Sequence, residues 1–361
     1  MGRKFAALCA ALSLFGVSAH AMAKDFHPEE NGFLPCPSGC AKITIKDPTW
    51  PLPAVRVDSR SPPDNYIRYR VIVGVDGKVK TLNILRLVGS AEMVPQIKRG
   101  LLHWDARATT DNGTSIEFAD ILMERYGPII LGPIRKSLKD AGKQAQTLLM
   151  ADRRDEAERI LIAAVKTSDQ NSNERLFLAG LLGSIEIGKG EFLAAADLLD
   201  EPCDGLFENA RIQPTPTGPI LEQMASLRIQ AALGVGDVVT ALTVLKTIQK
   251  KGDVDTDGHL AAAVANVRSD LDKANVIPVQ AVIPAQDVGD GFFFNLYRRH
   301  FDFHLLSGAL KDYSLSCPQG IIDKPVDEAV RHDVPDDWGA SCGLYVTGTP
   351  GTTFEVREYK N

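Results

Sequence analysis

The feature that most constrains the fold is a near-repeat in the middle of the chain. Three segments align on an alanine that is followed four residues later by a leucine. The segments are RRDEAERILIAAV, GKGEFLAAADLL and GVGDVVTALTVL, and the aligned residues are Ala157 and Leu161, Ala195 and Leu199, and Ala241 and Leu245. Because four residues span about one turn of an α-helix, each pair lies on one helix face. The pattern predicts three related helices, offset by 38 and 46 residues.

Each of these helices has a predicted partner before it. Residues with helical spacing fill the segments at about 136–150, 173–187 and 220–233. Paired helices with small residues at their contacts can stack closely and bury a shared face. Residues 133–273 are therefore expected to form a helical-repeat domain, interrupted by a loop at QPTPTG.

Residues 66–126 carry strand patterns instead. In YIRYRVIVGV, Arg68 and Arg70 alternate with apolar and aromatic residues, which is typical of a strand. Asp76-Gly77 predicts a tight turn, and KVKTLNILRL predicts the returning strand. A helix is expected from Ser90 to Trp104, followed by a third strand at SIEFADILMERY. This β-β-α-β order favours a helix packed on one face of a small antiparallel sheet.

Residues 276–361 return to strand patterns. Glycine, proline and β-branched residues separate five segments, which are VIPVQAVIP, FFFNLYRRHFDFHLL, ALKDYSLSC, SCGLYVTGT and TTFEVREY. A small all-β domain is expected here. The chain is thus predicted to be an α+β multidomain protein, with a Pro-containing lead-in at 24–65.

The first 23 residues have the pattern of a secretory signal peptide. Arg3 and Lys4 precede an apolar run of 13 residues, and Ala19-His20-Ala21 fits a cleavage site. The run is short for a membrane span, which needs about 20 residues. We expect export to the periplasm with cleavage near residue 23, and an N-terminal anchor in the inner membrane is the alternative. The net charge of −6, without a basic block, does not indicate nucleic acid or an anionic membrane surface as a partner.

Five cysteines follow the predicted signal peptide. Cys317 and Cys342 flank a 24-residue loop between predicted strands, which favours a disulfide. Such a link would stabilise the fold by about 3 kcal/mol. Cys36 and Cys40, in CPSGC, favour a local disulfide, with longer-range pairing or a metal site as alternatives. Cys203, in DEPCDG after a predicted helix, is the odd cysteine.

One predicted strand carries residues with metal-binding chemistry. In RRHFDFHLL, the strand period places Phe301 and Phe303 on one side and His300, Asp302 and His304 on the other. Two imidazoles and a carboxylate on one face could bind a divalent metal. The preferred interpretation is a half-buried strand with phenylalanines inward, because the sequence offers no fourth ligand.

No catalytic motif stands out. The chain lacks G-x-S-x-G, H-E-x-x-H, G-x-x-x-x-G-K-S/T and G-x-G-x-x-G. We therefore assign no catalytic residue and no cofactor, and we expect a non-enzymatic protein. The alternative is an exported hydrolase or metalloprotein with a site around His300, Asp302 and His304.

Residues 66–126 resemble the TonB C-terminal family. The resemblance rests on YRVIVGVDGKVKTLNIL, on a helix that ends in GLLHW, and on NGTSIEF. It implies a small sheet backed by helix, located in the periplasm and contacting an outer-membrane receptor or an inner-membrane transport complex. Residues 133–273 are similar to tetratricopeptide-like arrays, which present a concave surface to a peptide or protein.

The resemblance also suggests where a partner would dock. The third strand, SIEFADILMERY, is the expected docking edge, since an exposed sheet edge can accept a partner strand. The residues assigned to this contact are Ser115, Glu117, Phe118, Ile121 and Trp104. The expected function is docking of an envelope protein, linked to transport across the outer membrane.

Overall fold

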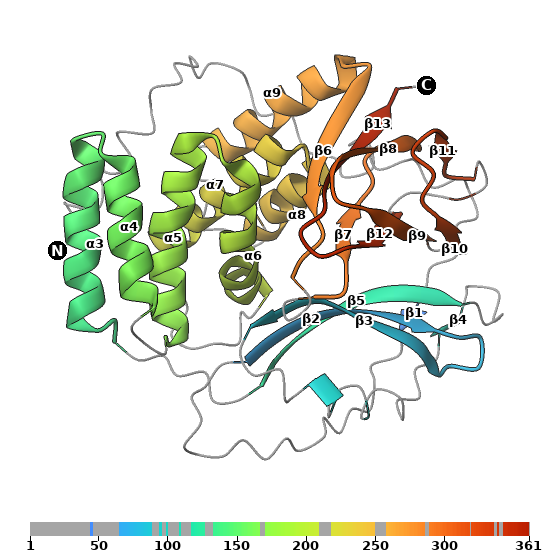
Figure 1. Ribbon diagram of the computed structural model, residues 1–361, viewed down its shortest axis with the longest axis horizontal. Helices are drawn as coiled ribbons and strands as arrows, with labels where there is room; N and C mark the ends of the chain where they lie inside the picture. The colour runs from blue at the N-terminus through green and yellow to red at the C-terminus, as the bar shows by residue number, and fades with distance from the viewer. Residues whose placement is uncertain are drawn as a thin grey trace.

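The computed structural model describes residues 44–45, 65–88, 94–95, 99, 108–109, 117–126, 133–166, 170–208, 218–249, 258–285, 289–317, 319–335, 338 and 342–360. Within these residues the fold is α+β, as predicted. Figure 1 shows a three-stranded sheet at the bottom, a helical region above it on the left, and two four-stranded sheets above it on the right. The predicted signal peptide lies outside the described residues, as does nearly all of the lead-in.

The three-stranded sheet contains the predicted hairpin. Its strands are β2 (Asn65–Val73), β3 (Val79–Val88) and β5 (Phe118–Tyr126), which pair antiparallel in the order β3-β2-β5. The turn is confirmed, because Gly77 has a φ of 80° and donates its N–H to Gly74 O. A two-stranded pairing of β1 (Thr44–Ile45) with β4 (Ala108–Thr109) was not predicted. The predicted helix from Ser90 to Trp104 lies outside the described residues, apart from 94–95 and 99.

Strand β2 is buried on both faces, which corrects the expectation of a sheet covered on one face. Tyr69 and Val71 on one face have no exposed surface. Tyr66 and Arg70 on the other face are each only 1% exposed. The reason is that the helices and the C-terminal sheets pack against the face that carries the arginines.

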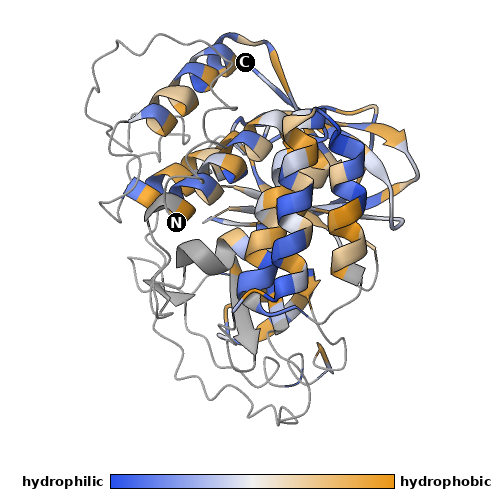
Figure 2. Ribbon diagram, turned by 90° about the vertical axis from the view of Figure 1, so that its left-hand side faces the viewer, coloured by the Kyte–Doolittle hydropathy of each residue, from blue (hydrophilic) through white to orange (hydrophobic). Residues whose placement is uncertain are grey.

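The helical region contains seven helices within the described residues. They are α3 (Lys136–Met150), α4 (Arg154–Lys166), α5 (Ser172–Lys189), α6 (Phe192–Glu208), α7 (Gly218–Val235), α8 (Val238–Gln249) and α9 (His259–Lys273). The predicted spans of α3, α5 and α7 are confirmed to within two residues at each end. Figure 2 shows polar and apolar residues side by side on these helices, which is typical of helices that pack on one side.

The near-repeat marks the contacts between the helices. The three aligned alanines and the three aligned leucines are all at most 1% exposed. Close approach is visible at Gly183 of α5, where a Cβ atom would lie 3.0 Å from Cγ of Leu199 in α6. Small residues on one helix therefore receive leucines from the next, as the sequence pattern predicts.

Helix α6 extends further than the sequence indicates. The sequence pattern predicts that the helix ends before Cys203, but α6 continues to Glu208 and contains Pro202. Cys203 is fully buried, and its thiol donates to the carbonyl of Met224 in α7, 3.8 Å away. Burial against α7 therefore outweighs the local cost of a proline inside the helix.

The C-terminal region is a sandwich of two antiparallel four-stranded sheets with the strand orders β10-β9-β12-β7 and β11-β8-β13-β6. The strands are β6 (Val276–Val282), β7 (Phe292–Asn295), β8 (His300–Ser307), β9 (Leu310–Cys317), β10 (Gly320–Pro325), β11 (His332–Asp333), β12 (Gly343–Gly348) and β13 (Thr353–Tyr359). Apolar residues of both sheets form one core. The predicted all-β region is therefore present.

Two details of this region differ from the sequence patterns. The segment FFFNLYRRHFDFHLL divides into β7 and β8, which belong to different sheets, because the chain turns at 297–299. Strands β10 and β11 were not predicted. No helix in the described part of the chain is both long and apolar enough to cross a bilayer.

Candidate functional site

The histidine face of β8 is occupied by contacts with neighbouring strands. Phe301 and Phe303 are at most 1% exposed and point into the sandwich core, as preferred from the sequence. On the other side, both carboxylate oxygens of Asp302 accept hydrogen bonds from Arg357, at 2.7 and 3.0 Å. His300 Nδ1 lies 2.5 Å from Asp333 Oδ1. Within the described residues, no group of three or more His, Cys, Asp and Glu side chains is placed to hold a metal ion, so His300, Asp302 and His304 are not brought together as ligands.

The predicted disulfide of the C-terminal region is confirmed. Cys317 at the end of β9 is bonded to Cys342, with their Cα atoms 4.3 Å apart. The bond closes the segment that carries β10 and β11, and it stabilises the folded state by restricting the unfolded chain. Cys36 and Cys40 lie outside the described residues, and the predicted pairing between them stays a prediction.

The residues assigned to docking have different surroundings. Phe118 is only 3% exposed, so it belongs to the core and is not available to a partner. Glu117 forms an ion pair with Lys80 at the start of β3, and Ile121 is half-buried on β5. Ser115 and Trp104 lie outside the described residues.

The two edges of the three-stranded sheet are not equivalent. At the β3 edge, Ile84 N donates to Asp290 Oδ2 at 2.8 Å, and Asp290 N donates to Ile84 O at 2.6 Å. Gly289 packs so closely there that a Cβ atom would lie 2.8 Å from Leu85 O. The chain just before β7 therefore covers this edge at Ile84. Strand β5 forms the opposite edge among the described strands, and it also contacts β9 and β10 of the sandwich.

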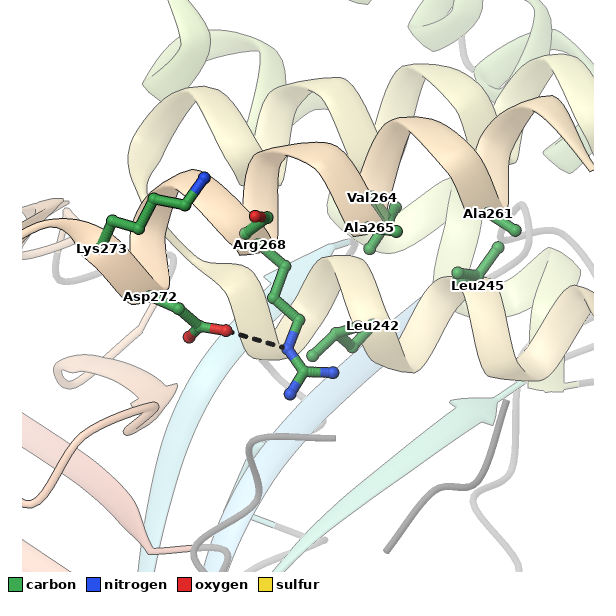
Figure 3. Close-up of a pocket in the computed structure, with 9 residues that line it drawn as sticks. Leu242, Leu245, Ala261, Val264, Ala265, Arg268, Asp272 and Lys273 are labelled. Carbon is green, nitrogen blue, oxygen red and sulfur yellow. Dashed lines mark ion pairs between the residues drawn. The ribbon is translucent and has the colours of Figure 1, made fainter. Parts of the chain in front are cut away.

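A cleft of about 470 Å³ lies between α8 and α9. Figure 3 shows its residues along the two helices, with apolar side chains at one end and charged side chains at the other. The residues that line it are Leu242, Leu245, Ala261, Val264, Ala265, Arg268, Ser269, Asp272 and Lys273. It is therefore a concave surface with an apolar and a polar end.

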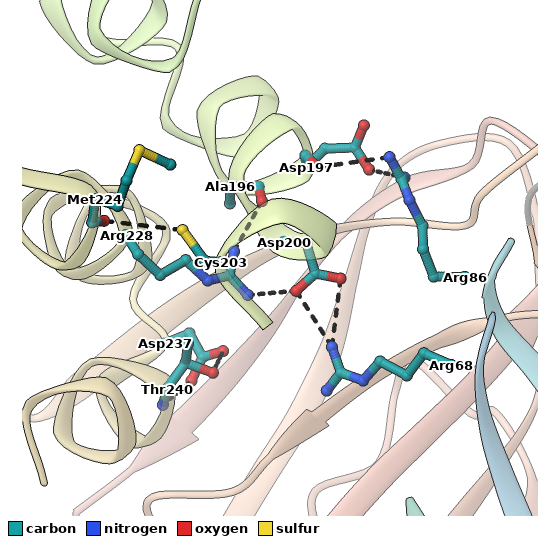
Figure 4. A network of polar contacts seen from close by, with 10 residues as sticks. All are labelled: Arg68, Arg86, Ala196, Asp197, Asp200, Cys203, Met224, Arg228, Asp237 and Thr240. Atoms are coloured by element: carbon teal, nitrogen blue, oxygen red, sulfur yellow. Dashed lines mark hydrogen bonds and ion pairs between the residues drawn. The ribbon is translucent and has the colours of Figure 1, made fainter. Parts of the chain in front are cut away.

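A network of ion pairs joins the three-stranded sheet to the helices. Arg68 of β2 donates to both oxygens of Asp200 in α6, at 3.2 and 3.3 Å. Arg228 of α7 donates to the same carboxylate, and Arg86 of β3 pairs with Asp197 one turn away on α6 (Figure 4). Burial of Asp200 disfavours its charge, but the guanidinium groups of Arg228 and Arg68 outweigh this effect and lower the pKa of the carboxyl. Asp200 is thus the shared acceptor between two parts of the molecule.

A second set of contacts links the three-stranded sheet to the sandwich. Arg70 of β2 is buried and donates to the hydroxyls of Ser314 and Ser316 on β9, at 2.6 and 2.5 Å. Its guanidinium carbon lies 5.2 Å from the ring centroid of Tyr345 on β12. Burial lowers the pKa of Arg70, because a charge is costly in a medium of low polarity.

A third set of contacts links the sandwich to the helices. Glu358 on β13 is 1% exposed, and its carboxylate accepts from the backbone N–H groups of Tyr297 and Arg298. Arg298 in turn donates to the carbonyls of Leu271 and Ala274 at the end of α9, at 2.5 and 2.8 Å. Burial raises the pKa of Glu358 to about 8, although the two N–H groups oppose the rise.

The sequence pattern does not predict these contacts between regions. It predicts only that Arg68 and Arg70 are the polar members of an alternating strand. The available signal was Tyr66, a large aromatic residue on the same side as both arginines. An aromatic residue there indicates that this side of the strand is also covered.

Comparison with known protein families and with curated proteins finds no match to this chain. The resemblances to the TonB C-terminal family and to tetratricopeptide-like arrays therefore stay predictions.

Proposed function

We propose that this chain is an exported, non-enzymatic interaction protein that docks an envelope protein through the β5 edge of its three-stranded sheet. Residues 66–126 would act as a TonB C-terminal-like module, and the helical region as a tetratricopeptide-like support. The partner class is an outer-membrane receptor or an inner-membrane transport complex. This docking would serve transport across the outer membrane.

The observation that carries the proposal is the difference between the two edges of this sheet. The backbone of β3 at Ile84 is already bonded to Asp290, whereas β5 ends the sheet among the described strands. An edge strand offers backbone donors and acceptors in the spacing that an added strand needs. A partner strand would therefore add at β5 rather than at β3.

Two of these sets of contacts support this role by holding the three-stranded sheet in place. Arg68 fixes the sheet to α6, and Arg70 fixes it to β9. A sheet that is held rigidly loses less conformational entropy when a partner strand is added to it. Docking at β5 would then require little change in the rest of the protein.

A cross-linking experiment in cells tests the docking edge. A photoreactive phenylalanine analogue replaces Ala119 on β5 or, as the matched control, Thr81 on β3. Both residues pair with Ile72 of β2, so they lie on the same face of the sheet at opposite edges. We expect one reproducible envelope protein to be cross-linked from position 119 and not from position 81. Equal cross-linking from both positions, or none from either, would contradict the proposal.

Export is tested separately. Sequencing of the N-terminus of the protein recovered from the periplasm should give a start near Lys24. A protein that keeps residues 1–23 would instead support the inner-membrane anchor.

A further inference from the structure

Strand β11 is a short strand at the edge of the sandwich. It consists of His332 and Asp333, and it pairs with β8 only at Phe301 and His300 (Figure 1). Beyond Phe301, no other described strand pairs with this side of β8. A strand that is held at two positions can leave its neighbour with the loss of few backbone hydrogen bonds.

The chain around β11 permits such a movement without unfolding the sandwich. Residues 327–331, just before β11, are exposed. Cys317 and Cys342 are bonded to each other on either side of this segment, so its ends stay together when its middle moves. A released β11 would therefore stay close to β8 and could pair with it again.

The inner side of β11 is held by an imidazole among aromatic rings. His332 is 9% exposed. Its ring centroid lies 4.9 Å from that of Tyr313 and 5.5 Å from those of Phe301 and Phe303. Its Nδ1 lies 3.1 Å from the hydroxyl of Tyr313, and its buried Nε2 has no hydrogen-bond partner among the described residues. This environment suits an uncharged ring, since little replaces the water that would solvate a cation.

A proton on His332 would change these contacts. A neutral imidazole can accept a hydrogen bond from Tyr313 at Nδ1, whereas the charged ring has two donors and no acceptor. Burial raises the pKa of Tyr313, so its hydroxyl stays neutral and does not compensate the new charge. The contact that fixes the imidazole in place is therefore lost or reversed in acid.

Charged groups face His332 from three other parts of the sandwich. Asp302 lies on β8, Lys324 on β10, and Asp327 on the segment that leads to β11. Burial lowers the pKa of His332 and is the largest effect, and the charge of Lys324 adds to it. The backbone and carboxylate of Asp327, and the carboxylate of Asp302, act in the opposite direction without outweighing burial.

The outer side of β11 carries a second titratable pair. His300 Nδ1 lies 2.5 Å from Asp333 Oδ1, and a charged imidazole strengthens such a contact. The two side chains are 26% and 63% exposed, so water screens the pair and limits its contribution. Acid therefore weakens the inner side of β11 at His332 more than it strengthens the outer side at His300.

We propose that β11 is a pH-sensitive strap, which leaves β8 in mild acid when His332 takes up a proton and so uncovers the backbone of His300 and Phe301. The folded protein binds this proton less tightly than the released segment does. The contact is therefore fully stable above about pH 6.5 and weakens as the pH falls below that value. The uncovered backbone extends the unpaired edge of β8. This inference goes beyond the proposed docking at β5 and does not rest on it.

Hydrogen exchange of the full exported chain tests the strap. The amide of Val334 donates to Arg299 O at 2.8 Å, and the peptide that contains it is followed by mass spectrometry. Between pH 7.5 and 5.0, after correction for the intrinsic exchange rate, we expect its protection to fall at least about threefold. A peptide from β12, an inner strand of the other sheet, should keep its protection.

Two substitutions assign the effect to one imidazole. His332→Phe keeps an aromatic ring in the core but takes up no proton, so protection at Val334 should be equal at the two pH values. His300→Gln is the matched control, because it removes the other titratable ring of β8 and β11. The response in this control should be at least as large as in the parent. Nuclear magnetic resonance of the parent protein should show His332 titrating below pH 6.5.

Three results would overturn the proposal. One is protection at Val334 that does not change with pH in the parent. Another is an equal loss in the β12 peptide, which would mean that acid destabilises the whole sandwich. The third is a loss that persists in His332→Phe or disappears in His300→Gln, which would assign the effect to another group.

The parent protein decides the matter even if His332→Phe does not fold. In that case a His332 ring that titrates at or above pH 6.5 contradicts the proposal, and one that titrates lower supports it together with the exchange data. None of these results bears on the docking edge at β5, which is tested by cross-linking.

Discussion

Arg68 and Arg70 lie two residues apart on the same strand, yet they are held in different ways. Arg68 meets the carboxylate of Asp200, and both side chains keep some contact with water, at 24% and 18% exposure. Arg70 is fully buried and meets two serine hydroxyls and a tyrosine ring. The first contact is an ion pair between the sheet and the helices. The second is a buried cation without a carboxylate among the hydrogen-bond partners described for it.

The comparison shows that a charged side chain can join two regions by attraction or by packing. The Asp200 network depends on opposite charges, so removing one charge leaves the others uncompensated. The contribution of Arg70 to stability comes from filling space and from its hydrogen bonds to two hydroxyls. An apolar side chain of similar size could therefore supply much of that contribution. Three predictions test this difference and a fourth tests the contacts of Glu358, beginning with the largest expected effect.

Removing the shared carboxylate should have the largest effect. Asp200→Ala leaves Arg68 and Arg228 without their common acceptor, and we expect the free energy of unfolding to fall by about 3 kcal/mol. Asp197→Ala is the matched control, because Asp197 lies on the same helix but is 60% exposed. Urea denaturation followed by circular dichroism measures both variants. A loss in Asp197→Ala as large as in Asp200→Ala would show that the network is ordinary surface charge.

Truncating Arg70 should lower the free energy of unfolding somewhat less than Asp200→Ala does. Arg70→Ala leaves a cavity and two hydroxyls without their donor, and we expect a loss of about 2 kcal/mol. Arg70→Met keeps the volume without the charge, and it should recover most of this loss. The same urea experiment gives both values. If Met proves no better than Ala, the charge of Arg70 matters more than its packing.

The contribution of Glu358 to the stability of the folded protein should depend on pH. Its pKa rises from an ordinary value of 4.5 to about 8 in the folded protein, so the native state binds the proton more tightly than the unfolded state. This stabilisation is fully present below about pH 4.5 and is lost as the pH rises through about 8. Glu358→Gln should remove this part of the pH dependence, which is measured as the unfolding midpoint between pH 5 and 9. An unchanged slope in the variant would show that the carboxyl is ionised in the folded protein.

Salt should have the smallest effect. Raising NaCl from about 0.05 to 0.5 M shortens the range of charge interactions, so it should weaken the partly exposed contact of Arg68 with Asp200. The change in thermal midpoint with salt should be larger in the parent protein than in Asp200→Ala, by about 1–2 °C. In Arg70→Met the response to salt should match that of the parent. If the response to salt is the same in all three proteins, the contact of Arg68 with Asp200 and the contacts of Arg70 do not differ in the way described.

Local sequence patterns predicted many of the helices and strands, because the spacing of apolar residues and the turn residues decide where these elements form. Helices α3, α5 and α7 lie where residues with helical spacing recur, and the aligned alanines and leucines are buried. The hairpin at Gly77 and the disulfide between Cys317 and Cys342 follow from turn chemistry and from the flanking strands. Local patterns failed at Pro202, which lies inside α6 because α7 covers that part of the helix.

The candidate sites were less predictable, because each joins residues that are far apart in the chain. The amino-acid sequence by itself determined the order of the regions, the helix and strand periods, and the small residues that let helices approach. Only the tertiary structure decided that both faces of β2 are covered and that Asp290 bonds the β3 edge. Arg68 meets a carboxylate 132 residues away, and Arg70 meets a hydroxyl 246 residues away. Spacing along a strand fixes the side to which an arginine points, but what it meets there depends on how separate regions pack.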